Sequence, residues 1–121
     1  MRRVLDTNVV LYLLGGRLAD NLPEGEYYVS VISEMELLSY PLLNASDSVR
    51  IHSFLADVQV VPLNEEVKHL AIELRRKHDL RLPDAIVAAT AEHLGAALVT
   101  NDAKLLRLSE LRTEKIKLRP L

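Results

Sequence analysis

The sequence contains no cysteine and no tryptophan, and it has only one phenylalanine, four tyrosines and four glycines. Without cysteine, the chain forms neither disulfides nor cysteine-ligated zinc sites. The scarcity of aromatic side chains argues against nucleic-acid binding by base stacking. No glycine-rich phosphate loop is present, which argues against hydrolysis of nucleoside triphosphates. The core must therefore be aliphatic, built mostly from Leu, Val, Ile and Ala.

Neither sign of charge dominates, since 15 basic and 17 acidic residues give a formal net charge of −2. Proteins dedicated to nucleic acid are usually strongly basic, so contact with nucleic acid would need a local patch or bound metal ions. Long apolar runs are missing too, because Asp6 and Asn8 interrupt the apolar N-terminal stretch. We therefore expect a buried first strand there, in place of a signal peptide or membrane span, and a cytoplasmic protein.

The length of 121 residues favours a single domain that covers residues 1–121. Hydrophobic residues make up 49% of the chain and charged residues 26%, a balance typical of globular proteins. Short apolar runs alternate with longer segments of helical periodicity, which is typical of β-α units on a parallel sheet. We predict an α/β fold, a three-layer α/β/α sandwich with a parallel sheet of about five strands.

The order of elements follows from this alternation. Strands are predicted at residues 3–5, 27–29, 58–61 and 96–100, with a last edge strand at 116–118. Helices are predicted at residues 7–14, 30–40, 47–57, 65–77, 84–93 and 102–108. Asn64 is expected to cap the helix that follows it, Pro83 to be a first helical residue, and Gly95 to end a helix.

Acidic side chains follow two of the predicted strands. Asp6 comes directly after the first strand, and Asp102 follows the strand at 96–100. In an open parallel sheet, ligands bind outside the carboxyl ends of the strands. If these two strands are parallel neighbours, both carboxylates reach one crevice.

Two further acids, Glu36 and Asp84, fall near helix starts, which point to the same edge as the strand ends. Each of the four acids has a structural explanation on its own, such as an N-cap, a turn, an exposed helix position or a favourable place in the helix dipole. A structural explanation fits Asp84 least well, because the first two turns of its helix contain almost no other polar residue. An acid on such a helix needs a partner or a solvent-filled site. For Glu36, the nearby Glu34 is a competing candidate.

Together the four carboxylates would repel one another, and their pKa values would rise. A divalent cation would neutralise such a cluster, and oxygen ligands suit Mg²⁺ or Mn²⁺ better than zinc. A cation held by carboxylates retains open positions for water and for a phosphate group. The cluster therefore predicts metal-assisted phosphodiester hydrolysis, in which the metal lowers the pKa of a bound water.

Four stretches in this order resemble the signatures of PIN domains, and most nearly those of VapC-type toxins of toxin–antitoxin pairs: residues 5–8 (LDTN), 33–38 (SEMELL), 83–91 (PDAIVAATA) and 100–102 (TND). The resemblance covers nearly the whole chain. It implies a Mg²⁺- or Mn²⁺-dependent endoribonuclease, a small antitoxin partner and a homodimer.

The resemblance also assigns residues. It implies that the catalytic and metal-binding acids are Asp6, Glu36, Asp84 and Asp102. Thr7 is expected to help hold the site, and Thr100 and Asn101 to orient Asp102. RNA as the substrate follows from the resemblance alone.

Basic residues are densest at Arg75, Arg76, Lys77 and Arg81. We interpret this run as the solvated face of a helix in preference to a phosphate-binding surface. Lys104, two residues after Asp102, is better placed to contact a substrate phosphate.

Two other function classes share some of these features. A non-catalytic PIN-like binding module would keep the fold without the chemistry, although the presence of all four acids argues against it. A receiver-like phosphoacceptor domain also has acids at strand ends. It predicts paired acids at the first strand and a Lys after the last one, and this chain shows neither clearly.

Overall fold

The strands form one parallel sheet in the computed structural model, which describes residues 1–120. Its strand order is β3-β2-β1-β4-β5, and every pairing in it is parallel. The strands are β1 (Arg2–Leu5), β2 (Glu26–Ser30), β3 (Gln59–Val61), β4 (Ala97–Val99) and β5 (Thr113–Glu114). Since all strands run in the same direction, their carboxyl ends share one edge of the sheet.

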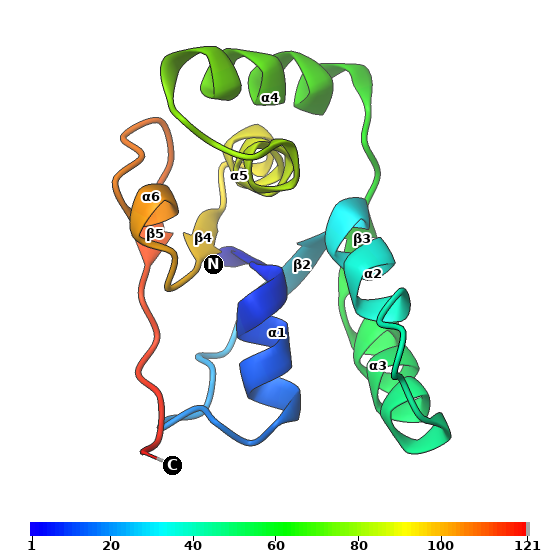
Figure 1. The fold of residues 1–121 in the computed structure, drawn as a ribbon. Helices are drawn as coiled ribbons and strands as arrows, with labels where there is room; N and C mark the ends of the chain where they lie inside the picture. Colours follow the sequence, from blue (N-terminus) through cyan, green and yellow to red (C-terminus); the bar gives the residue numbers. More distant parts are fainter. Residues whose placement is uncertain (121) are drawn as a thin grey trace.

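Helices cover both faces of this sheet, as Figure 1 shows, with α4 and α5 on one side and α1 on the other. The helices are α1 (Thr7–Leu14), α2 (Val31–Leu38), α3 (Ala45–Asp57), α4 (Glu65–Lys77), α5 (Leu82–Leu94) and α6 (Ala103–Leu106). The predicted three-layer α/β/α sandwich is therefore confirmed. Among residues 1–120, no helix combines the length and the apolar character needed to cross a membrane.

Two aliphatic cores lie on the two faces, because successive strand side chains point to opposite sides. Val4 belongs to the core beneath α4 and α5, where Leu98 also lies. Leu5 belongs to the other core, with Val99 and with Val9 of α1. The start of α5 is apolar almost all round because it lies against both the sheet and α4.

Most helix ends follow the local signals. The side chain of Asn64 accepts a hydrogen bond from Val67 N at 2.9 Å and so caps α4, as predicted. Gly95 ends α5 in a left-handed conformation, with φ of 61°. Pro83 is the second residue of α5, one position later than predicted, because the helix begins at Leu82. A proline is tolerated there because the first turn has no intrahelical partner for its nitrogen.

The predicted edge strand at 116–118 is wrong. The last strand is β5, which pairs with β4 through Leu98↔Thr113 and Val99↔Glu114. Ile116 N donates instead to the Asn101 side chain at 3.0 Å, and Leu118 forms only an isolated antiparallel bridge with Leu18. Ile116 packs against the core beside α1 from outside the sheet. The apolar pattern of this segment therefore indicates partial burial and not strand pairing.

A close approach of two backbone segments fixes the start of β2. Gly25 has φ of 152°, and a Cβ there would lie 2.6 Å from the carbonyl oxygen of Met1. That same oxygen accepts a hydrogen bond from Glu26 N at 3.0 Å, which begins the β1–β2 pair. A side chain at this position would therefore force the first two strands apart.

We predict that Gly25→Ala lowers the free energy of unfolding by about 3 kcal/mol, since its backbone conformation is nearly exclusive to glycine. Gly95→Ala is the matched control, because a Cβ there would meet no atom within 4 Å. Its cost is only that of a left-handed alanine, about 1 kcal/mol. Urea unfolding followed by circular dichroism measures both values. Equal losses in the two variants would contradict the role of the Met1 contact.

Candidate functional site

The pairing of β1 with β4 brings Asp6 next to Thr100. Leu5 lies opposite Val99 in the register, and Asp6 N donates to the Val99 carbonyl at 3.1 Å. The Thr100 hydroxyl, fully buried, donates to Asp6 Oδ2 at 2.8 Å. The same Oγ1 accepts from Asp102 N at 3.0 Å. One hydroxyl therefore connects Asp6 to the turn that carries Asp102.

Asp102 is held as the N-cap of α6. Its Oδ1 accepts from Lys104 N at 2.9 Å and from Leu105 N at 3.1 Å. In the part of the chain that the structure describes, its Oδ2 makes no hydrogen bond. The structural explanation for Asp102 is therefore met by one carboxylate oxygen, and its role as a metal ligand stays a prediction for the other.

Glu36 reaches the site through Thr7. The Thr7 hydroxyl lies 2.7 Å from Glu36 Oε1 and 2.8 Å from Ser33 Oγ. A carboxylate can only accept a hydrogen bond, and the Thr7 hydroxyl has a single proton to donate. Thr7 therefore donates its hydrogen bond to Glu36 and accepts one from the Ser33 hydroxyl. Glu34, one residue after Ser33, makes no side-chain hydrogen bond among residues 1–120. The contact with Thr7 therefore distinguishes Glu36 from its competitor.

Asp84, in the first turn of α5, forms an ion pair with Arg81. Arg81 Nε lies 3.3 Å from Asp84 Oδ2, and their side chains are 79% and 21% exposed. The hydrogen bond with Asp84 raises the pKa of Arg81, and attraction to Glu36 and Asp102 adds to the rise. Sequence reasoning assigned Arg81 to a solvated helix face, whereas the structure brings it to the acids. Its position three residues before Asp84 is the signal that could have revealed the pair.

Electrostatic effects connect Asp6 with two of the other acids, Asp84 and Asp102. Burial raises the pKa of Asp6 most, and the negative charges of Asp84 and Asp102 raise it further. The hydrogen bond from Thr100 opposes these effects and lowers it. Asp6 is only 7% exposed, so ionising it costs free energy that no neighbouring cation in the site recovers fully.

The donor set is all oxygen, which suits a hard cation such as Mg²⁺ or Mn²⁺. Among residues 1–120, no three His, Asp or Glu side chains are close enough to form a complete metal cage. Mg²⁺ does not require one, because it is commonly bound by one or two carboxylates together with waters and substrate phosphates. The open acidic edge fits a cation of that kind.

Two further residues named from the sequence have other contacts. Asn101 Oδ1 accepts from Ile116 N, so its side chain fastens the C-terminal segment. Lys104 Nζ lies 3.1 Å from the carbonyl oxygen and 3.3 Å from the carboxylate of Asp79. Lys104 therefore ties α6 to the loop between α4 and α5, and its proposed contact with a substrate phosphate stays a prediction.

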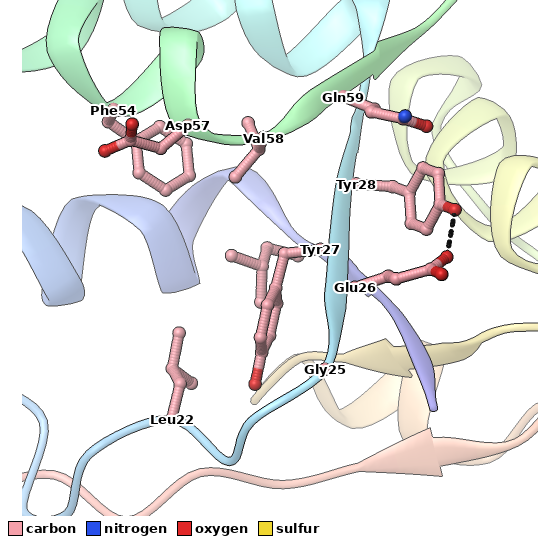
Figure 2. A pocket seen from close by; sticks show the side chains of 10 residues that line it. Leu22, Gly25, Glu26, Tyr27, Tyr28, Phe54, Asp57, Val58 and Gln59 are labelled. Carbon is pink, nitrogen blue, oxygen red and sulfur yellow. Dashed lines mark hydrogen bonds between the residues drawn. The ribbon is translucent and has the colours of Figure 1, made fainter.

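A pocket of about 440 Å³ lies elsewhere, between β2 and the end of α3 (Figure 2). Tyr27, Phe54 and Val58 contribute to its wall, and the Tyr28 hydroxyl beside it donates to Glu26 at 2.6 Å. None of the four acids lines this pocket. The acidic edge and this pocket are therefore separate places on the protein.

Comparisons with known proteins agree with this fold. A family model described as PIN domain matches residues 3–111. The fold is similar to a chain in the structure of VapBC2 from Rickettsia felis bound to a DNA fragment from their promoter, with a TM-score of 0.81, 20% identity, and coverage of 97% of this chain and 100% of that chain. No curated protein sequence matches.

Two other solved structures extend the likeness. VapBC-1 from nontypeable Haemophilus influenzae gives a TM-score of 0.74 at 25% identity, covering 95% of this chain and 98% of that one. PAE2754 from Pyrobaculum aerophilum gives 0.61 at 21% identity, covering 93% and 89%. The family model spans most of the chain and includes all four acids, which confirms the resemblance seen in the sequence. The chain belongs to the PIN domain family.

Proposed function

We propose that the chain is an endoribonuclease that depends on Mg²⁺ or Mn²⁺ and hydrolyses phosphodiester bonds in RNA with metal-activated water. The observation that carries this proposal is the convergence of Asp6, Glu36, Asp84 and Asp102 from separate elements onto one sheet edge. Membership of the PIN domain family supports it, since nucleases are typical of that family.

Asp6 would be the central ligand of the cation because it is the most buried of the four acids, and the other three would contact the cation directly or through bound waters. When bound, a divalent cation lowers the pKa of a water ligand and polarises the scissile phosphate. Repulsion among carboxylates in a partly desolvated site supports such a cation, because its charge would offset the cost of keeping Asp6 ionised.

The remaining residues keep the ligands in place. Thr100 orients Asp6 and the Asp102 turn at once. Thr7, itself held by Ser33, orients Glu36. Arg81 places a positive charge beside Asp84 and limits the repulsion at the edge before a phosphate arrives. Such supporting hydrogen bonds fix the ligand oxygens, which is what a preorganised site requires.

We propose further that the chain acts in the cytoplasm as a homodimeric toxin, neutralised by a cognate antitoxin protein. This rests on its similarity to chains in structures described as toxin–antitoxin complexes, including one from Klebsiella pneumoniae with a TM-score of 0.76 at 24% identity. Two alternatives remain, a non-catalytic binding module and, with less support, a receiver-like phosphoacceptor. The hydrogen-bonded acidic edge favours the enzyme over both.

We predict that Glu36→Gln and Asp84→Asn each reduce metal-dependent cleavage of a fluorescently labelled RNA panel by roughly 100-fold or more, because each removes a charged ligand of the cation. Rates are measured with Mg²⁺ and with Mn²⁺, and with EDTA as the blank. Glu34→Gln is the matched control, since it removes the same charge from the same helix without touching Thr7.

Retained cleavage in both Glu36→Gln and Asp84→Asn would overturn the assignment of the acids. Loss of activity in Glu34→Gln alone would show that the wrong glutamate was chosen. Phosphate uptake from a small phosphodonor, without RNA cleavage, would favour the receiver-like alternative.

We predict that Asp6→Asn raises the stability of the metal-free protein at neutral pH. The folded state raises the pKa of Asp6 above its unfolded value, so protonated Asp6 favours folding, and that contribution is lost as the pH rises through the folded pKa. The advantage of Asn should therefore vanish as the pH falls to about 4, near the ordinary value of an aspartate. Thermal unfolding across this range measures it.

The Asp6→Asn variant also tests whether a divalent cation binds at Asp6. Millimolar Mn²⁺ should raise the melting temperature of the unmodified protein and of Asp57→Asn, an exposed acid at the end of α3, but not of Asp6→Asn. A similar Mn²⁺ response in Asp6→Asn would place the cation elsewhere, and no response in any protein would favour the non-catalytic module.

A further inference from the structure

A second surface lies beside the acidic edge, at the C-terminal end of α4. A groove of about 640 Å³ runs along this helix end and the loop that leads to α5. Its charged lining comprises three cations and one carboxylate, and its apolar lining includes two exposed side chains: Arg75, Arg76, Lys77 and Asp79, with Ile72 and Leu82. We call these six residues, with His78, the basic groove.

His78 forms an ion pair with Glu110 at 2.8 Å, whereas, within the described part of the chain, the three longer cations of the basic groove form no such pair. Among residues 1–120, no carboxylate lies within 4 Å of the Arg75, Arg76 or Lys77 side-chain nitrogens. Arg75 Nε donates to the Leu80 carbonyl at 3.2 Å, which holds its guanidinium against the loop. The groove is therefore a local cationic surface on a chain whose net charge is −2.

Stabilisation of the helix dipole explains why basic residues end α4. It does not explain the two apolar side chains beside them. Ile72 is 48% exposed and Leu82 is 50% exposed, and both line the same groove as the cations. A surface that combines cations with exposed apolar side chains matches a nucleotide strand, which offers phosphates on one side and ribose and base on the other.

Two contacts connect the groove to the acids. Arg81, in the loop, forms the ion pair with Asp84. Asp79, also in the loop, receives Lys104, which lies two residues from Asp102. The loop between α4 and α5 is thus joined at two points to the elements that carry Asp84 and Asp102, so the groove and the acidic edge are neighbours.

We propose that the basic groove binds the single-stranded RNA that flanks the scissile phosphate, with Arg76 and Lys77 on its phosphates and with Ile72 and Leu82 against ribose or base. The proposal rests on the proposed function for the identity of the strand. Among the described residues that line the groove there is no Phe, Tyr or Trp and no Asn or Gln, so we expect it to supply affinity and register in preference to sequence specificity.

The test measures binding of a fluorescein-labelled single-stranded RNA by anisotropy in EDTA, so that the RNA stays intact and the result does not depend on catalysis. We expect the double variant Arg76→Ala with Lys77→Ala to weaken binding about 10-fold. A plot of the logarithm of the association constant against the logarithm of the salt concentration has a negative slope. This slope should become less steep by about 1.4, since each phosphate contact on a single strand contributes about 0.7. Circular dichroism and thermal unfolding check the fold of each variant.

The matched control is Lys115→Ala with Lys117→Ala, which removes two exposed positive charges from the C-terminal segment. Its affinity and salt slope should equal those of the unmodified protein. Ile72→Ser should weaken binding with an unchanged salt slope, because it removes apolar contact without removing charge.

Equal affinity and salt slope in the Arg76/Lys77 variant and the unmodified protein would overturn the proposal. An equal loss of RNA affinity in the Lys115/Lys117 control would also overturn it. So would an Arg76/Lys77 variant that binds RNA normally but loses affinity for an acidic peptide such as polyglutamate. If RNA binding depends on the groove while no RNA is ever cleaved with Mg²⁺ or Mn²⁺, the groove stands and the proposed endoribonuclease fails. The two failures are therefore separate.

Discussion

The parallel pairing of β1 with β4, with Leu5 opposite Val99, decides which residues meet at the acidic edge. A slip of one residue would turn the side chains of β1 to the wrong faces and separate Asp6 from the Thr100 hydroxyl. That hydroxyl also receives Asp102 N, so the register fixes two acids at once. Since Thr7 follows Asp6 directly, the same register also sets where Glu36 is held.

The edge is an electrostatic compromise between folding and activity. Burial of Asp6 near Asp84 and Asp102 raises its pKa, and the Thr100 hydroxyl and the Thr7 backbone amide offset only part of that effect. Proteins commonly accept the cost of such burial at functional sites. The net charge of the whole chain hides this arrangement, because acids gather at the strand ends while basic residues gather at the C-terminal end of α4. Figure 1 shows α4 lying across α5.

Local signals predicted much of the fold. The caps at Asn64 and Gly95, the strand order along the chain and the apolar α5 all depend on residues close in sequence. Strand ends and helix starts in a parallel α/β fold share an edge by geometry, so the convergence of the four acids also followed from the order of elements. The last strand was misplaced because the apolar pattern at 116–118 indicates burial, and edge pairing depends on which backbone faces β4.

The sequence by itself determined the α/β class, the order of elements and a shortlist of acids, because helix periodicity, strand runs and caps act over a few residues. Only the tertiary structure shows the contact of Glu36 with Thr7 across 29 positions, which Glu34 does not share. The tertiary structure also shows that Arg81, which the sequence placed on a solvated helix face, forms an ion pair with Asp84. These outcomes depend on how separate elements pack together, and side-chain contacts between distant segments leave no periodic trace in the sequence.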